Sequence, residues 1–548
     1  MNDQSFDEIA VQEARPVNPE LEAAARETLG RLSRGKAPAR AAEFTVSYYD
    51  IKVALKDGSA LLFNSLTRSL ILLSVEETAV YNALGSEPFP AQKIHDPLLL
   101  RALMAGGHIV GASKDEVGGV QRSYEATRAS KNTMVLTIAP TMACNFACGY
   151  CFQGLLKPTK KMGREVQDAI LTFIKAQEGL KGLSVVWYGG EPLMGRDSIY
   201  RLSDSLIAWC DKNRISYSAG IVSNAWFLDA EVASQLHARR VRWVQVTIDG
   251  DRDTHNQMRP LTSGKGTYDR IIENIGDTLD NTPMNVSVRV NVGQSNIDRA
   301  SAMLDEFAER GFAQRGSFYV YFSAIEASTP ESGTAFDEKM AKADFNKQVL
   351  GLEDKARKLG LAGIQKAPGG FSGMCVAASS NGLVVAGNGD IHKCWETAHD
   401  PTKRVGTIFE PESMVDNINK AVWDEWSPFD NPVCRSCKIL PMCGGHCAHR
   451  FIYGDGTALP CPSWKWNTAE YIFARARDLG VVAADQWLPD QSTITAKQSG
   501  ERHSPESLKQ SQTRVLEKVS AKTGETFDID ALFAGEVEAG GIGSDRNV

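Results

Sequence analysis

Strand-like runs alternate with helical patterns through the middle of this 548-residue chain. The runs are rich in Val, Ile and aromatic residues, and they cover residues 134–139, 184–188, 218–223, 244–249, 285–292 and 317–325. Between them, apolar residues recur at helical spacing over residues 163–178, 198–212, 229–240, 268–280 and 298–310. This alternation predicts an α/β fold with a parallel sheet and helices outside it. Six units are too few for a closed eight-stranded barrel.

Three cysteines follow the first run directly, in the sequence CNFACGYC. Cys144, Cys148 and Cys151 have the spacing C-x3-C-x2-C. A [4Fe–4S] cluster held by four cysteines is coordinatively full, whereas three thiolates leave one iron free to bind a small molecule. Two other interpretations are a zinc knuckle that lacks its fourth ligand and three thiols without a shared role.

The triplet, with the aromatic Tyr150 just before its last cysteine, resembles the signature of the radical S-adenosylmethionine (SAM) enzymes. The resemblance implies a partial, TIM-like (β/α)6 barrel over residues 130–330. It also implies that the amino and carboxylate groups of SAM chelate the open iron, and that reductive cleavage of SAM yields a 5′-deoxyadenosyl radical. In barrels of this type the chemistry lies at the carboxyl ends of the strands.

A Gly-Gly-Glu-Pro run follows the second strand-like run. Two glycines allow the backbone to approach a ligand closely, and a carboxylate beside them can accept hydrogen bonds from an ammonium group. In the radical SAM family this motif contacts the methionyl amine of SAM, so the resemblance gives that role to Gly189, Gly190, Glu191 and Pro192. The alternative is a turn that merely uses its glycines.

Polar residues also end the next two strand-like runs. Ser223 and Asn224 end the third, where the family places contacts to the ribose or carboxylate of SAM. After the fourth, VQVTIDGDRDTHNQMRP resembles the corresponding stretch of peptide-modifying members. Its Arg259 is a candidate for the SAM carboxylate, because a guanidinium fork suits that group; a surface ion pair with a nearby Asp is the competing interpretation. Asp249 could act in the site or cap the following turn, and we expect the cap.

Seven further cysteines resemble, in order and spacing, the SPASM domain, which binds auxiliary iron–sulfur clusters. By the pattern of that family, the distal cluster would be ligated by Cys434, Cys437, Cys443 and Cys461. The nearer cluster would have only Cys375, Cys394 and Cys447, because residues 376–393 contain no cysteine. We therefore expect an open iron or a non-cysteine ligand there. Both clusters are expected to be [4Fe–4S]. For the nearer one, a [2Fe–2S] cluster is a second possibility. Zinc is the alternative metal for these cysteines.

Cysteine usage predicts the compartment. Ten thiols assigned to clusters need reducing conditions, and the acidic, polar N-terminus does not resemble a secretory signal, so a cytoplasmic location is expected. The eleventh, Cys210, lies on the apolar face of a predicted helix, where an inert thiol is the default. A net charge of −7 without a Lys/Arg stripe disfavours a nucleic-acid partner, and no window is apolar enough to predict a membrane span.

The chain has room for several domains. Residues 1–42 are predicted to be a flexible lead-in, and residues 481–548, which are polar, a flexible tail. Residues 43–125 weakly resemble the winged-helix unit that binds a leader peptide by adding it to a sheet edge; a simple cap on the barrel is the alternative. The barrel then covers residues 130–330 and the SPASM auxiliary domain residues 331–480.

Together these features resemble radical SAM/SPASM maturases of ribosomally made peptides. The resemblance implies a precursor peptide with a leader as substrate, a crosslink or related modification as product, and a reductant such as flavodoxin or ferredoxin. A sulfatase maturase ranks second. In those enzymes an Asp serves as the base, and the corresponding position in this chain is Trp395. A non-catalytic iron–sulfur carrier or scaffold and a small-molecule enzyme stay open. Tyr321, Glu326 and Trp395 are candidate cavity residues, and no catalytic acid or base is assigned.

Overall fold

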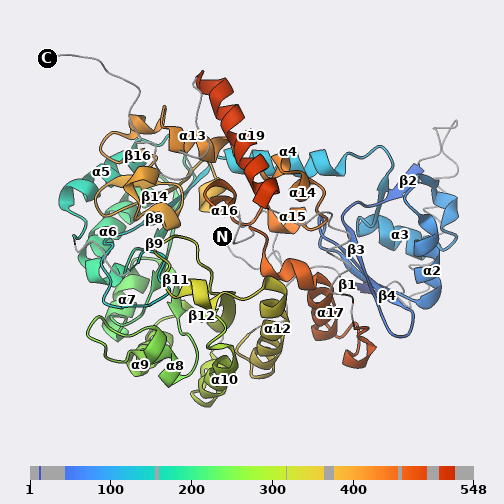
Figure 1. Ribbon diagram of the computed structural model, residues 1–548, viewed down its shortest axis with the longest axis horizontal. Helices are drawn as coiled ribbons and strands as arrows, with labels where there is room; N and C mark the ends of the chain where they lie inside the picture. Colours follow the sequence, from blue (N-terminus) through green and yellow to red (C-terminus); the bar gives the residue numbers. More distant parts are fainter. Residues whose placement is uncertain are drawn as a thin grey trace.

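The structure is a computed structural model that describes residues 11–13, 43–154, 160–315, 317–362, 375–454, 460–489, 491 and 505–524. Its centre is a nine-stranded sheet with the order β13-β12-β11-β10-β9-β8-β14-β15-β16 (Figure 1). From β8 to β13 each strand is parallel to its neighbour and follows it in sequence. The predicted parallel α/β sheet is therefore confirmed.

The six parallel strands coincide with the predicted strand-like runs to within three residues at each end. They are β8 (Thr133–Ile138), β9 (Gly182–Trp187), β10 (Ser216–Ser223), β11 (Val241–Thr247), β12 (Asn285–Val292) and β13 (Phe318–Ala324). The apolar pattern explains the agreement: in β12, Val286, Val288, Val290 and Val292 alternate along the strand and are at most 1% exposed. Residues two apart share one face of a sheet, so this face is committed to the core.

Helices follow the strands and cover the outer side of the sheet (Figure 1). In α5 the residues Val166, Ile170 and Ile174 are buried at helical spacing, as the sequence pattern predicts. Helices α6, α7, α9 and α10 also bury apolar residues on one face, whereas α8 buries only His255. Their bounds are α5 (Arg164–Lys175), α6 (Arg196–Lys212), α7 (Ala230–Ala238), α8 (Arg252–Met258), α9 (Tyr268–Asn281) and α10 (Ala300–Glu309).

The cysteine-rich segment shares the sheet of the barrel, which the sequence pattern did not predict. Strand β14 (Gly382–Val385) pairs in parallel with β8, and β15 (Asp390–His392) and β16 (Gly406–Thr407) continue the sheet in antiparallel fashion. These strands have only two to four residues, too few to give a clear pattern. Seven α-helices complete the described part of the segment: α11 (Ala335–Glu338), α12 (Lys342–Lys358), α13 (Ile418–Glu425), α14 (Pro432–Arg435), α15 (Leu440–Cys443), α16 (Ala448–Ile452) and α17 (Thr468–Asp478).

The N-terminal unit lies at one end of the molecule, away from the barrel helices (Figure 1). It has two small sheets, with the orders β1-β5-β4-β3 and β6-β2-β7. The winged-helix likeness and the leader-binding role stay predictions. The elements are β1 (Val11–Glu13), β2 (Glu43–Val46), β3 (Asp50–Ala54), β4 (Ala60–Asn64), β5 (Leu70–Leu73), α2 (Val75–Leu84), β6 (Phe89–Pro90), α3 (Pro97–Ala105), β7 (Ile109–Gly111) and α4 (Glu116–Ala129).

A helix lies inside the segment predicted to be a flexible tail. Helix α19 (Pro505–Thr523) packs against α13 and α16. Its residues Leu508, Val515, Leu516 and Val519 are at most 4% exposed. The expectation of a flexible tail is therefore wrong for this helix. Its apolar face is narrow and most of its residues are polar, so the composition did not indicate a packed helix. No helix in the described part of the chain is both long and apolar enough to cross a membrane.

Candidate active site and auxiliary cysteine groups

A cavity of ≈ 290 Å³ lies at the carboxyl ends of the parallel strands. It is lined by side chains from the barrel and from the cysteine-rich segment. Most of the predicted cofactor-binding residues meet there: Cys144, Cys148, Cys151, Tyr150, Gly189, Gly190, Ser223, Asn224 and Arg259. Of the three candidate cavity residues, Glu326 and Trp395 line it, whereas the hydroxyl of Tyr321 donates to Gln245 Oε1.

The loop with the cysteine triplet is held by the segment after Arg259. The amide of Ala147 donates to Pro260 O at 2.9 Å, and the amide of Thr262 donates to Asn145 O at 2.9 Å. Burial raises the pKa of Cys148 to about 11, so an isolated thiolate at this position is unfavourable. Iron bound to the sulfur would compensate the buried charge. The donor set thus fits a metal cluster with three thiolate ligands.

The Gly-Gly-Glu-Pro turn touches this loop backbone to backbone. The amide of Gly190 donates to Thr141 O at 3.2 Å, and the amide of Glu191 donates to Ala143 O at 2.8 Å. A Cβ at Gly189 would lie 2.3 Å from Thr141 O, and one at Gly190 2.2 Å from Ala143 O. Only glycine allows this approach. The motif therefore fixes the wall of the cavity beside the cysteines.

The carboxylate of Glu191 is turned into the protein and is not among the residues that line the cavity. Its Oε1 accepts from Leu193 N and Ser223 Oγ, each at 2.9 Å, and its Oε2 accepts from Asn224 N at 2.7 Å. Burial raises its pKa to about 7. Where the sequence led us to expect a contact to the SAM amine, the side chain instead joins the motif to the end of β10.

Replacement of Glu191 by Ala is expected to lower the thermal stability of the anaerobically reconstituted protein by several degrees. Three buried donors would lose their acceptor, at a cost of about 3 kcal/mol. Differential scanning calorimetry measures the change, and titration with SAM measures the expected loss of affinity. Glu231→Ala, which removes an exposed carboxylate from α7, is the matched control. Equal melting temperatures for both variants would contradict the positioning role.

Tyr150 is the centre of a buried polar network. Its hydroxyl donates to Asp249 Oδ2 and accepts from Arg259 Nη1 at 2.5 Å and Asn291 Nδ2 at 3.1 Å. Asp249 is 0% exposed, and its Oδ1 also accepts a hydrogen bond from the backbone amide of Asn291. The expectation that Asp249 caps a turn is wrong, because Asp251 caps α8 instead.

Arg259 is paired and still faces the cavity. Its Nη1 lies 3.8 Å from Asp249 Oδ2, so the Asp partner predicted as the competing interpretation is present, although the pair is buried rather than on the surface. Its Nε has no hydrogen-bond partner among the described residues. A guanidinium with a free N–H at a cavity wall remains suited to bind a carboxylate.

The assignment of the auxiliary cysteines to two clusters stays a prediction, and the electrostatic neighbours of two of them agree with it. Burial raises the pKa of Cys434, and the neighbouring Cys443, Cys461 and Cys437 raise it further. Burial likewise raises the pKa of Cys394, with added shifts from Glu396, Cys375 and Cys447.

Within the described residues, no group of three or more His, Cys, Asp or Glu side chains is arranged to hold one metal ion. Cys210 is 0% exposed in α6, outside both groups.

Several cavity residues were not singled out from the sequence. Arg450 contacts Glu326 across the cavity, and Glu396 comes from the turn that follows Cys394. The ring of Trp395 stacks on Tyr188 with the centroids 5.4 Å apart. The only signal for Glu396 was its place two residues after a candidate ligand. For Arg450, no sequence signal existed.

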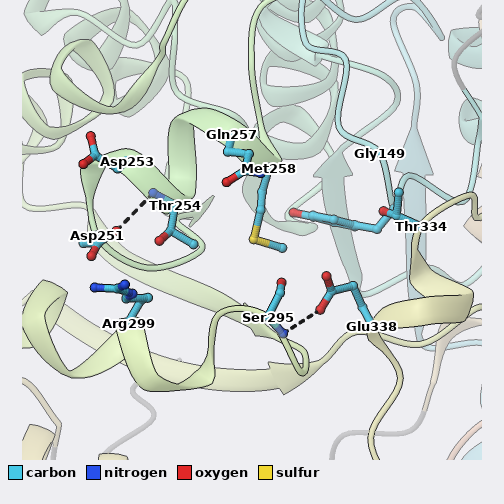
Figure 2. A pocket seen from close by; sticks show the side chains of 11 residues that line it. Gly149, Asp251, Asp253, Thr254, Gln257, Met258, Ser295, Arg299, Thr334 and Glu338 are labelled. Carbon is cyan, nitrogen blue, oxygen red and sulfur yellow. Dashed lines mark hydrogen bonds between the residues drawn. The ribbon is translucent and has the colours of Figure 1, made fainter.

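A second cavity, of ≈ 530 Å³, is lined by Gly149 and Tyr150 of the cysteine loop and by residues of α8. Figure 2 shows Asp251, Asp253, Arg299 and Glu338 around it. Two of these carboxylates serve the backbone, since Asp251 accepts from Thr254 N and Glu338 accepts from Ser295 N, each at 3.0 Å. Tyr150 lines both cavities.

Comparisons with known proteins agree with this geometry. A family model described as the radical SAM superfamily matches residues 138–322. A serine-type anaerobic sulfatase-maturating enzyme of Klebsiella aerogenes is 23% identical over 336 residues, which are 57% of this chain and 79% of that protein. The sporulation killing factor maturation protein SkfB of Bacillus subtilis is 24% identical over 176 residues, which are 32% of this chain and 40% of that protein.

A solved structure has the same fold. The structure of anSMEcpe with bound AdoMet and Kp18Cys peptide has a TM-score of 0.50 and 18% identity, and the match covers 64% of this chain and 99% of that one. The cysteine triplet at the end of β8, the glycine turn after β9 and the matched residues all lie in one barrel. Residues 138–322 of the chain therefore form a domain that matches the radical SAM superfamily.

Proposed function

We propose that the protein is a radical SAM/SPASM peptide maturase, which removes a hydrogen atom from a ribosomally made precursor peptide and installs a crosslink or related modification. One observation carries this proposal. The cavity that contains Cys144, Cys148 and Cys151 also contains Trp395 and Glu396, which directly follow Cys394 of the nearer auxiliary group. A substrate in this cavity would lie between the SAM site and an auxiliary electron acceptor.

Different residues of the cavity have different proposed roles. The three cysteines would hold the [4Fe–4S] cluster, and the backbone at Gly189 and Gly190 would support SAM beside it. Bound SAM would supply the 5′-deoxyadenosyl group that takes the hydrogen atom from a substrate carbon. The stacked rings of Tyr188 and Trp395 would form an apolar wall beside the reacting carbon.

Peptides are supported as the substrate class by the names of the relatives, which are maturation enzymes for a sulfatase and for a sporulation killing factor. The N-terminal unit offers the sheet β1-β5-β4-β3 for strand addition, and parts of both of its edges already have partners. Gln491 hydrogen-bonds both the amide and the carbonyl of Ala54 in β3, and β1 pairs with β5. A leader strand at the β5 edge would therefore have to replace β1.

A sulfatase-maturase-like oxidation to formylglycine is the second candidate. The absence of an Asp directly after Cys394 argued against it from the sequence. Glu396, one residue further on, brings a carboxylate into the same cavity. The 23% identity to the Klebsiella enzyme favours this alternative as well.

Product analysis separates the two candidates. The reduced protein is incubated with SAM and either the peptide encoded beside its gene or a peptide with a sulfatase Ser motif. A crosslink is expected as loss of two hydrogens without a free aldehyde. Formylglycine would instead react with a hydrazide probe. An aldehyde from the sulfatase peptide, with the neighbouring peptide unchanged, would contradict the crosslinking proposal.

A further inference from the structure

Three arginines line the cavity that contains the cysteine triplet, and one of them has no carboxylate partner among the described residues. Arg259 faces Asp249, and Arg450 is bound to Glu326. The third is Arg289 of β12. We propose that Arg289 binds a carboxylate side chain of the substrate, at or beside the residue that loses its hydrogen atom. This inference rests on the proposed function, because it takes the substrate to be a peptide.

The alternation of β12 places Arg289 on the inner face of the sheet. Its neighbours Val288 and Val290 are 0% exposed and belong to the opposite face of the strand. Arg289 is in register with Thr247 of β11, and Asn291 follows it on the same face. All three of these polar residues line the cavity. The guanidinium is therefore presented at the carboxyl ends of the strands, where the cysteine triplet also lies.

Two hydrogen bonds hold the guanidinium of Arg289 from one side. Its Nε donates to Asn291 Oδ1 at 2.8 Å, and its Nη2 donates to Ser323 Oγ at 2.9 Å. Its Nη1 donates to no group in the part of the chain that the structure describes, and the side chain is only partly buried. Both acceptors are neutral, so these bonds position the positive charge without compensating it. A guanidinium fixed in this way is pre-organised to bind an anion.

Gln245 adds a second donor to the same wall of the cavity. Its Oε1 accepts from the hydroxyl of Tyr321 at 2.6 Å, which leaves Nε2 as the other end of the amide. Tyr321 is the register partner of Arg289 in β13, so its bond to Gln245 in β11 spans β12 at the level of Arg289. Gln245 and Arg289 both line the cavity. Two donors suit a carboxylate, which has two oxygen acceptors, better than an amide, which has one.

The carboxylates that already line the cavity do not neutralise Arg289. Glu326 is bound by Arg450, and within the described ranges no ion pair joins Arg289 to Glu326 or to Glu396. SAM would bring one carboxylate, and Arg259, beside the cysteine triplet, is the candidate for it. A partly buried cation without a partner is unfavourable, and a second anion would offset that cost. A Glu or Asp side chain of the peptide has this chemistry, and the carboxylate of SAM is the other source to be tested.

The first test measures how fast phenylglyoxal, which modifies accessible guanidinium groups, reacts with Arg289 in the anaerobically reconstituted full-length protein without SAM. Mass spectrometry of the digested protein gives the modified fraction, and the exposed Arg214 is the internal reference. Saturating N-acetylglutamic acid α-amide is expected to slow the reaction at Arg289 by about tenfold, because a charge-assisted hydrogen bond is at stake. The uncharged N-acetylglutamine α-amide should not slow it.

Three results would overturn the proposal. If Arg289 does not react with phenylglyoxal, its guanidinium is not open to the cavity. If the acid and the amide have the same effect, the site does not select a carboxylate. If N-acetylglutamine with a free α-carboxylate protects Arg289 and N-acetylglutamic acid α-amide does not, the site binds a chain terminus rather than a side chain.

Equilibrium dialysis with radiolabelled SAM separates the two sources of a carboxylate. Arg259→Gln is expected to weaken SAM binding by about tenfold or more, whereas Arg289→Gln should change it by no more than about twofold. Arg289→Met is the second variant if the Gln variant does not fold. Equal weakening by the Arg259 and Arg289 variants would assign Arg289 to SAM and overturn its assignment to the substrate. Neither measurement needs turnover, and 5′-deoxyadenosine formation by the unmodified protein is measured separately, so failure of this inference is distinguishable from failure of the proposed function.

Discussion

Replacement of Cys151 by Ala is expected to abolish formation of 5′-deoxyadenosine and to lower the iron content by about four per chain. The triplet has no spare ligand, and Cys151 lines the cavity with its two partners. Two thiolates do not hold a cluster with an open iron, so SAM would have no site to chelate. Chromatography of the reaction with dithionite and SAM measures the product, and a colorimetric assay measures the iron.

Cys210→Ala is the control for loss of a buried thiol. Cys210 is 0% exposed, and burial raises its pKa to about 11, but it lies in α6 away from both auxiliary groups. Its variant should keep full iron content and deoxyadenosine formation. If Cys151→Ala retained both properties, the triplet would not be the ligand set.

Replacement of Lys465 by Met is expected to lower the reduction potential of the distal auxiliary cluster by on the order of 100 mV. Lys465 is 4% exposed, and its Nζ donates to Cys461 Sγ at 3.7 Å. A buried cation beside the sulfur ligands favours the reduced, more negative cluster. Removing this charge therefore makes reduction less favourable. An EPR-monitored redox titration measures the potential.

Lys518→Met removes the same charge from the exposed side of α19 and serves as the control. Solvent screens that charge, so its variant should leave the potential unchanged. A potential that does not move in Lys465→Met, with all irons still bound, would show that Lys465 does not tune the cluster. A distal cluster with a high reduction potential would accept the electron that remains on the substrate and so remove it from the cavity.

The strands were predictable because each has a run rich in β-branched and aromatic residues, and the site motifs were predictable because they lie at the ends of those runs. Strand β14 was missed, since a four-residue strand leaves no periodic signal. Helix α19 was missed because polar residues surround its few apolar ones.

Side-chain direction was the part of the site that the sequence could not supply. Glu191 was expected to face SAM, but three donors hold it inside the protein. Asp249 was expected to cap a turn and instead binds Tyr150. Glu396 carries no motif, and only the folding of the Cys394 turn against α16 shows where its carboxylate lies.

The most direct test of the account is anaerobic reconstitution of the full-length protein, a count of iron and sulfide, and then reaction with dithionite and SAM. Three [4Fe–4S] clusters predict about twelve irons per chain together with 5′-deoxyadenosine. Zinc in place of iron, or a fully loaded protein that forms no deoxyadenosine, would contradict radical SAM chemistry and favour a non-catalytic scaffold.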